Sequence, residues 1–384
     1  MKQPNWARNL RVGSAVLSLA LVAAACSSGS TSAGSLATSS TTNSGVGSGN
    51  QAAATYVRNL EQRPTSLDVK SIPKPIPSGL NIDFIACGLP VCTEFYKVVQ
   101  SAATVLGWNV KLLNGGLTPE SFTTAYNQAI QDKPSGVIGS GAFYPQLLTS
   151  QFQKLKNEGV PVMLYDAPNV PPGVTGVFVN AQNQAEYGKQ LAEYVLSQVG
   201  AHGSTNVALA YSPANITSYQ PMHAAFTSTL KAACPNCTIS NFQFADTAIG
   251  TTLPSQTTAY VLSHPTVKYL VFDYSNEIDG LPSALQAAGM KPGQVKLLAT
   301  DMTPGEAPYM AQGWYTAAAG IPWPEAMWSM MNVFAWFHDG LSTATPLQQI
   351  LPNWIITPAS LPSTTNYFPL VANYQSAFKK AWGK

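Results

Sequence analysis

Three aspartates stand where a carboxylate could bind a ligand or take part in catalysis. Asp166, Asp273 and Asp301 each come at the end of a short apolar or β-branched run. An ionised carboxylate only accepts hydrogen bonds, so it would bind the hydroxyl or ammonium groups of a ligand. Each aspartate could equally cap the helix that follows it. Because charged residues make up only 10% of the chain, this repetition favours a polar site.

Asp166 and Asp301 could also act as a catalytic pair. Two carboxyl groups about 5 to 9.5 Å apart can hydrolyse a glycosidic bond. The other common catalytic signatures are missing from the sequence: the Gly-x-Ser-x-Gly elbow, the Gly-x-x-x-x-Gly-Lys phosphate loop and the His-Glu-x-x-His metal motif. We therefore expect a binding protein, not an enzyme, that needs no cofactor. A cleft hydrolase is the alternative.

The five cysteines separate into one single residue and two close pairs. Cys87 pairs with Cys92 and Cys234 with Cys237 by proximity in the sequence, which leaves Cys26. In an oxidising compartment local disulfides are the simplest interpretation. Two alternatives remain: a zinc site built from all four paired cysteines, and a redox function for Cys234-Pro-Asn-Cys237. Otherwise we expect no metal site.

The N-terminus has the pattern of an export signal. A basic start leads into the weakly polar run Val12–Ala25, which ends in Ala23-Ala24-Ala25-Cys26. Small residues before a cysteine resemble a bacterial lipoprotein processing site, so residues 1–25 are predicted to be a signal peptide and Cys26 to carry the lipid. The alternative is ordinary cleavage that leaves Cys26 as a free thiol.

A spacer without charge follows the predicted signal. Residues 26–54 are rich in Ser, Thr, Gly and Ala, which predicts a flexible tether. Residues 55–80 then predict a short helix and a proline-rich segment that lead into the folded part.

Length and charge bound the function further. A chain of 384 residues is long enough for about two domains. Removing the first 25 residues takes away three basic and no acidic side chains, so 20 minus 18 becomes 17 minus 18, or −1. A nearly neutral chain lacks the basic surface of nucleic-acid-binding proteins, so we expect no nucleic-acid partner.

Short apolar runs alternate with helical patterns from residue 81 onward, as in proteins built from parallel β-α-β units. The predicted strands are 82–87, 108–113, 136–139, 160–165, 207–211, 238–244, 269–273, 295–300 and 315–320. Between them, Thr118 with Pro119 and Glu120 predicts a helix start, and the spacing of Leu191, Val195 and Val199 predicts a helix over 184–199.

One apolar stretch is long enough to be tested as a membrane span. Residues 315–337 are interrupted by Pro322, Pro324 and Glu325, so a strand followed by a buried helix explains them better.

Parallel α/β sheets bind ligands at the carboxyl ends of their strands. The same ends carry aromatic residues that could form apolar walls with polar tips. These are Phe143, Tyr144, Tyr211, Tyr219, Tyr274 and Trp323.

Several local patterns recur in the order and spacing of one known family. They are Leu106-Gly107-Trp108-Asn109-Val110, Glu158-Gly159-Val160-Pro161-Val162, Ser263-His264-Pro265 and Leu298-Ala299-Thr300-Asp301. Over about residues 81 to 350 the chain resembles the periplasmic sugar-binding proteins of type I fold, the ribose-binding group.

The resemblance implies an α/β fold of two similar, doubly wound parallel-sheet lobes, joined by three crossovers, with a ligand cleft between them. The crossovers would lie near 179–182, 320–322 and 351–354. The N-terminal lobe would comprise residues 81–180 and 322–352, and the C-terminal lobe and tail residues 181–321 and 353–384.

The resemblance also implies a function. It predicts a monomeric, lipid-anchored protein at the outer face of the bacterial cytoplasmic membrane, which captures a solute by lobe closure and delivers it to the permease of an ABC importer. The alternative is a sensory lipoprotein that signals to a membrane receptor.

The predicted site keeps part of the family pattern and loses the rest. Sugar binders of this group place aromatic rings where this chain has Val91 and Cys92, arginines where it has Ala167 and Met222, and glutamine where it has Gly320. Asp166, Asp301 and Asn276 match, although a one-residue shift would put Ser275 in place of Asn276. The implied ligand-binding residues are Phe143, Asp166, Tyr219, Met222, Tyr274, Asn276, Asp301 and Trp323.

The missing arginines predict a ligand unlike ribose. Each arginine would offer a rigid fork of donors to two sugar hydroxyls. Without them, a more apolar ligand, or one that presents donors to the two aspartates, fits better. A cation is a further alternative, because carboxylates beside aromatic faces suit one.

Overall fold

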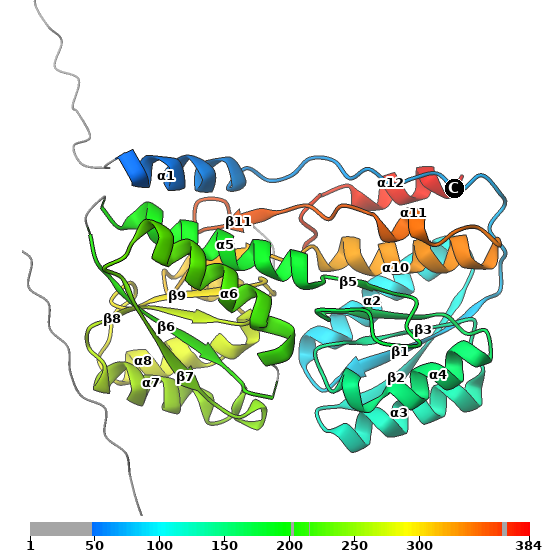
Figure 1. Ribbon diagram of the computed structural model, residues 1–384, viewed down its shortest axis with the longest axis horizontal. Coiled ribbons are helices and arrows are strands. Elements are labelled where there is room, and N and C mark those ends of the chain that lie inside the picture. The colour runs from blue at the N-terminus through cyan, green and yellow to red at the C-terminus, as the bar shows by residue number, and fades with distance from the viewer. Residues whose placement is uncertain (1–47, 201–202, 215, 363–366) are drawn as a thin grey trace, which may run out of the picture. The chain divides into compact units, whose positions relative to one another are not determined.

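The computed structural model describes residues 48–200, 203–214, 216–362 and 367–384. Two parallel-sheet lobes account for most of them (Figure 1). The predicted signal peptide, Cys26 and most of the predicted tether lie outside the described residues. Within the described part of the chain, no helix combines the length and apolar character that a membrane span needs.

The first lobe is built on a five-stranded parallel sheet. Its order is β2-β1-β3-β4-β5. The strands are β1 (Asn81–Cys87), β2 (Asn109–Gly116), β3 (Gly136–Ser140), β4 (Val162–Tyr165) and β5 (Gly176–Phe178). Its helices are α2 (Pro90–Leu106), α3 (Pro119–Asp132), α4 (Thr149–Asn157), α10 (Trp323–His338), α11 (Ala344–Leu347) and the short 3-10 turn η1 (Pro145–Leu147).

The second lobe repeats this plan with six strands. Its order is β11-β10-β9-β8-β6-β7, parallel except for β11. The strands are β6 (Asn206–Tyr211), β7 (Thr238–Gln243), β8 (Val267–Phe272), β9 (Lys296–Thr300), β10 (Tyr315–Gly320) and β11 (Trp354–Ile356). Its helical segments are α5 (Ala181–Gln198), α6 (Ile216–Ala233), η2 (Asp246–Ala248), α7 (Leu253–Ser263), η3 (Ser275–Ile278), α8 (Leu281–Ala287) and α9 (Ala307–Ala311).

Local signals explain where helices begin. Thr118 Oγ1 accepts from Ser121 N at 3.3 Å, while Ser121 Oγ accepts from Thr118 N at 3.2 Å, so α3 starts with a reciprocal cap. Pro119 takes the first helical position and Glu120 lies in the first turn, where its charge favours the helix dipole. The predicted start of this helix is confirmed.

The apolar stretch over 315–337 becomes β10 and α10. Nearly all of α10 is buried, because α2 contacts it from one side and α12 (Tyr374–Ala381) from another. Trp328 illustrates this burial: its Nε1 donates to Ser101 Oγ at 3.1 Å and its ring stacks on Trp382 with centroids 5.1 Å apart. The burial of α10 on more than one side thus explains why its sequence is apolar all round.

The chain passes between the lobes at three places near the predicted ones. These lie between β5 and α5, between β10 and α10, and between α11 and β11. Val179, at the first of them, has φ +59° and is fully buried. A β-branched residue rarely adopts this left-handed conformation, so packing around the crossover holds it there.

The segments before β1 and after β11 also run from one lobe to the other (Figure 1). Helix α1 (Ser48–Leu60) packs on α5 of the second lobe. Further along, Pro77 O accepts from Trp108 Nε1 of the first lobe at 2.7 Å. The chain after β11 ends in α12, which lies on α10 of the first lobe.

Two predicted boundaries need correction. Helix α1 begins at Ser48, so residues 48–54 are helical instead of belonging to a flexible tether; Ala53 and Val57 are only 3% and 5% exposed. The tail does not stay with the second lobe, because Tyr374, Phe378 and Trp382 pack their rings on Trp328. In both cases apolar contacts decide the position of a segment whose composition gives little local signal.

Both predicted disulfides are present in the structure. Cys87 joins Cys92, and Cys234 joins Cys237. Their sulfur atoms are therefore not thiolates that could ligate zinc. No group of three or more potential ligands in the described chain is placed to hold a metal ion.

Candidate functional site

A cavity lies between the carboxyl ends of the two sheets. The first lobe contributes its wall from the ends of β1, β3 and β4 and from the start of α2, and the second lobe from α6, from the residues after β8 and from Asp301. Ile321 and Trp323, beside the second crossover, complete it. The cavity volume is about 40 Å³, which is room for a few water molecules. Binding a sugar-sized molecule therefore requires the walls to move apart.

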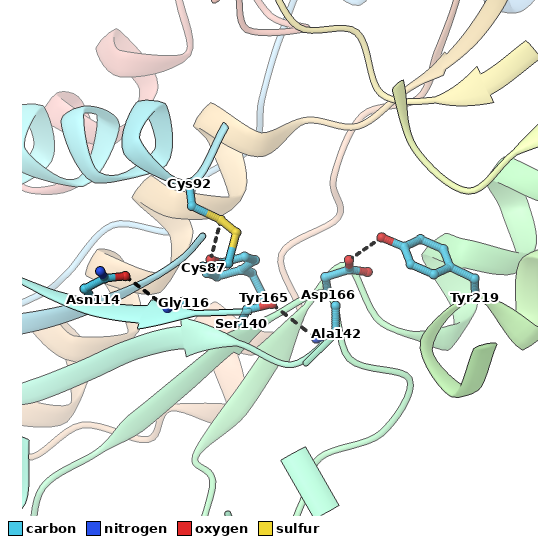
Figure 2. Close-up of a disulfide and its surroundings, with 9 residues drawn as sticks. All are labelled: Cys87, Cys92, Asn114, Gly116, Ser140, Ala142, Tyr165, Asp166 and Tyr219. Atoms are coloured by element: carbon cyan, nitrogen blue, oxygen red, sulfur yellow. Dashed lines mark hydrogen bonds between the residues drawn. A yellow bond between two sulfur atoms is a disulfide. The ribbon is translucent and has the colours of Figure 1, made fainter. Parts of the chain in front are cut away.

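Asp166 follows β4 and reaches into this cavity from the first lobe. Its Oδ1 accepts from Gln184 Nε2 and its Oδ2 from Tyr219 OH, both at 2.7 Å. Figure 2 shows the carboxylate directed toward the Tyr219 hydroxyl. Both donors belong to the second lobe. Burial raises the pKa of Asp166 to about 6, although these two hydrogen bonds act in the opposite direction.

Asp301 follows β9 and occupies the equivalent place in the second lobe. Its Oδ1 accepts from Met302 N at 2.7 Å and from Tyr367 OH at 3.4 Å, and its Oδ2 accepts from Trp323 Nε1 at 3.0 Å. Trp323 is the first residue of α10, in the first lobe. Burial raises the pKa of Asp301 to about 7.

The two aspartates share an unusual backbone conformation. Asp166 has φ +60° and Asp301 has φ +68°, the left-handed region that few residues other than glycine adopt. In each case the backbone N–H donates to the end of the neighbouring strand, Phe178 O at 3.0 Å and Ala319 O at 2.8 Å. Such conformations persist where the surroundings enforce them, often at functional sites. Each carboxylate is thus held at one lobe's edge and bonded by side chains of the other lobe.

The third strand-end aspartate does not reach the cavity. Asp273 is fully buried, and His223 Nε2 lies 2.5 Å from its Oδ1. Its backbone N–H donates to Glu277 Oε2 at 2.9 Å. Burial raises the pKa of both Asp273 and Glu277. None of these three residues lines the cavity, and their contacts hold the segment that follows β8.

Glu306 organises the polar edge of the second lobe. Its carboxylate accepts from Ser275 Oγ at 2.9 Å, Asn276 Nδ2 at 3.0 Å, Thr303 N at 3.0 Å and Thr303 Oγ1 at 2.5 Å. Of the two residues predicted for this position, Asn276 lines the cavity and Ser275 does not. The sequence analysis missed Glu306, although Thr303-Pro-Gly-Glu306 has the spacing of a capping box.

Aromatic rings form the apolar wall. Phe95 is central: its ring centroid is 4.9 Å from Trp323 and 5.5 Å from Tyr165. On the other side, Tyr219 and Tyr274 lie 5.8 Å apart. Sequence reasoning missed Phe95 and Tyr165, because a helix residue and the last residue of a buried strand look like core.

Most of the residues predicted for the site do line the cavity. They are Phe143, Asp166, Tyr219, Tyr274, Asn276, Asp301 and Trp323. Two further aromatic candidates lie outside its lining: Tyr144 donates to Leu117 O at 3.3 Å, and Tyr211 OH accepts from Gln243 Nε2 at 2.6 Å.

Met222 is a correction. It is fully buried in α6 and does not line the cavity. The backbone of α6 at Met222 comes so close to Gly188 of α5 that a β-carbon on this glycine would lie 2.1 Å from Met222 O. Residue 222 is three residues after Tyr219 and is rotated only about 60° from it around the helix axis, yet this rotation is enough to leave its side chain in the core instead of at the cavity. Its role is to pack α6 on α5.

The Cys87–Cys92 disulfide takes the place where the family pattern has aromatic rings. Both cysteines and Val91 line the cavity. Cys92 Sγ lies 3.4 Å from Tyr165 OH (Figure 2). None of the described residues that line the cavity is a lysine, arginine or histidine.

Comparison with known proteins identifies the family. The model of the periplasmic binding protein domain matches residues 87–336, well over half of the chain. The chain belongs to the periplasmic binding protein family. No curated protein matches the chain as a relative.

Solved structures of the same fold include proteins whose titles name sugar or solute binding. An ABC sugar transporter subunit from Rhodobacter sphaeroides is 18% identical, with a TM-score of 0.61, over 73% of this chain and 99% of that one. A solute-binding protein from Agrobacterium vitis with bound allitol is 16% identical, with a TM-score of 0.62, over 74% and 97%. The glucose-galactose binding protein GanP from Geobacillus stearothermophilus is 13% identical, with a TM-score of 0.64, over 74% and 100%. The predicted type I fold is confirmed.

Proposed function

We propose that this protein captures a small solute between its lobes outside the cytoplasm and delivers it to an ABC importer. The observation that carries the proposal is the pair Asp166 and Asp301, which project from equivalent strand ends into one cavity and are hydrogen-bonded by the opposite lobe. A ligand that replaces Tyr219 OH on Asp166 would be contacted by both lobes. Its binding would therefore be coupled to their closure.

The N-terminal sequence supports a lipid anchor for this function. In the proposal, residues 1–25 direct export, the lipid is attached to Cys26, and the segment before α1 tethers the two lobes to the outer face of the membrane. A protein held beside its permease works as a monomer, because both halves of the binding site come from one chain.

The lining supports a ligand unlike ribose. The two family positions that carry arginine are Ala167 and Met222 here, and the wall that replaces the missing donors is apolar and aromatic. A closed site would leave sugar hydroxyls unpaired, at a cost of about 1–3 kcal/mol for each such group. We therefore propose a ligand with a substantial apolar surface.

Signalling is the second candidate. One structure of the same fold, 17% identical with a TM-score of 0.62, is that of a protein named XylFII in a complex with LytSN. Hand-over to a protein partner is therefore compatible with this fold. Transport and signalling differ in the partner that recognises the closed lobes.

Native mass spectrometry of gently purified protein tests the binding role. We expect a retained small molecule, released on denaturation and identified by fragmentation, which is lost from the variant Asp166→Ala/Asp301→Ala. The control is Asp68→Asn, because Asp68 is exposed and its carboxylate pairs with Lys70, outside the cavity lining. The proposed role is wrong if the variant retains the same small molecule as the parent protein. It is also wrong if neither protein binds any pentose, hexose, polyol or amine in a thermal-shift panel. Conversion of the bound solute into a product would instead show an enzyme.

A further inference from the structure

We propose that the solute is a small organic cation, a protonated amine with an apolar body. This inference rests on the proposed binding function and specifies the ligand class for the same cavity. It follows from three features of the lining: its acceptors, its small number of free donors, and its aromatic rings.

Each of the two aspartates keeps free acceptor sites. A carboxylate has about four lone-pair sites. Asp166 uses two, for Gln184 and Tyr219, and Asp301 uses three, for Met302, Trp323 and Tyr367. About two sites on Asp166 and one on Asp301 are left for a ligand. An ammonium group has three N–H donors and no acceptor, so its hydrogen bonds can all be satisfied by such a set.

The donors of the lining are mostly occupied. Tyr219 OH donates to Asp166, Trp323 Nε1 to Asp301, and Asn276 Nδ2 to Glu306. Tyr274 OH is the exception, a buried hydroxyl with no partner in the described structure. A sugar or polyol brings an acceptor with every donor, and a closed site must supply donors for them. This lining offers few of them, whereas an amine needs none.

Charge balance leads to the same ligand class. Asp166 and Asp301 are each 5% exposed, and the described lining contains no cationic side chain. Two buried carboxylates without a counter-charge are costly to ionise. A bound ammonium group supplies the positive charge that the chain itself does not place there.

The rings provide the second half of the recognition. Phe95, Tyr165 and Trp323 gather near Asp301, and Tyr219 and Tyr274 lie together near Asp166. Faces of aromatic rings attract cations, and their apolar surface accommodates a hydrocarbon body. Arginine-lined sugar sites lack this combination of aromatic faces with unopposed carboxylates.

Isothermal titration calorimetry with matched probes tests the inference. Benzylammonium, benzyl alcohol and benzyltrimethylammonium share one body and differ in charge and N–H donors; ribose and allitol form the polyol arm. At pH 8 we expect benzylammonium to bind at least tenfold more tightly than benzyl alcohol and than either polyol. Benzyltrimethylammonium should be at least tenfold weaker than benzylammonium, because it cannot donate to the carboxylates.

Variants connect the preference to the two aspartates. Asp166→Asn and Asp301→Asn should each weaken benzylammonium binding at least tenfold while changing benzyl alcohol binding less than threefold; the exposed control Asp68→Asn should change neither. Circular dichroism melts check that each variant is folded.

The possible outcomes separate the two proposals. Tight binding of ribose or allitol without benzylammonium binding would overturn the cation inference and leave the solute-binding function standing. Equal affinity for ammonium, alcohol and quaternary probes would overturn the role of the carboxylates. If no probe binds and no small molecule co-purifies, the solute-binding function itself fails.

Discussion

The two lobes have the same plan but present different chemistry to the cleft. The first lobe offers one carboxylate, Asp166, in a wall of apolar side chains and a disulfide. The edge of the second lobe carries five buried carboxylates, Asp246, Asp273, Glu277, Asp301 and Glu306, of which Asp301 lines the cavity. Each lobe thus offers one carboxylate to the cavity, but only the second lobe supports its own with a further buried polar network.

The largest loss of stability should follow from removing the Glu306 carboxylate, which organises the second lobe's edge. Glu306→Ala removes the acceptor of four hydrogen bonds and leaves the buried donors of Ser275, Asn276 and Thr303 unpaired. We expect a loss of about 3 kcal/mol in the free energy of unfolding, measured by urea denaturation. In the first lobe, Asp132→Ala at the exposed pair with Lys111 should cost less than about 1 kcal/mol. Equal effects would show that the Glu306 network contributes no more to stability than this exposed ion pair.

Removing the disulfide of each lobe in turn should give the next largest effects. Each closes a short loop, so replacing either pair with serines should lower the free energy of unfolding by about 2 kcal/mol. Only the Cys87→Ser/Cys92→Ser variant should also change ligand affinity, because Cys87 and Cys92 line the cavity and the Cys234–Cys237 pair does not. Calorimetric titration with the same probe separates the two effects. Unchanged affinity in the first-lobe variant would show that this wall is not part of the site.

The pH dependence of stability reports on both aspartates. Their pKa values are raised to about 6 for Asp166 and about 7 for Asp301, above the range of about 4 for an unfolded chain. The folded protein then holds more protons, and its stability falls as the pH rises from about 4 to 7. Asp166 faces Tyr219 and Asp273, and Asp301 faces Glu306 and Tyr367.

Melting temperatures at several pH values test this dependence. We expect the melting temperature to be a few degrees higher at pH 5.5 than at pH 7.5. Asp301→Asn should reduce this difference, because an amide mimics the protonated acid. A melting temperature that rises between pH 5.5 and 7.5 would contradict the pKa shifts.

The sequence predicts the long strands and the overall fold better than it predicts the short strands and the start of α1. Nine strands follow from apolar runs, and the Asp166 and Asp301 positions follow from the rule that parallel strands share a carboxyl edge. Strands β5 and β11 have three residues each, too few for a pattern, and exist because β4 and β10 offer them hydrogen-bonding partners. Helix α1 was missed at its start because Gln51-Ala-Ala-Ala resembles the low-complexity segment before it.

Site residues can be predicted from the sequence when they lie at the end of a strand. They are harder to predict when their place depends on which way a helix faces or on contacts between distant parts of the chain. The prediction that Met222 contacts the ligand was wrong, because a family pattern does not show which face of α6 packs on α5. Tyr367 lies far along the chain from Asp301, and nothing local indicates that its hydroxyl contacts Asp301. Its contact follows from the path of the tail between the lobes.

The smallest effect should come from this tail contact. Tyr367→Phe removes a hydrogen bond of 3.4 Å to Asp301, so it should cost less than about 1 kcal/mol in the free energy of unfolding and change ligand affinity less than threefold. Tyr96→Phe is the control outside the cavity: Tyr96 OH donates at 3.3 Å to Val110 O and accepts at 2.9 Å from Gln100 Nε2. A tenfold loss of affinity in Tyr367→Phe alone would make the tail a direct part of the site.

A crystal structure of the protein with its co-purified or tightest-binding solute tests the central claim most directly. The account predicts the solute between the lobes, its donors on Asp166 and Asp301 and its body against Phe95 and Trp323. A solute bound anywhere else, or between the lobes with neither carboxylate in contact, would contradict it.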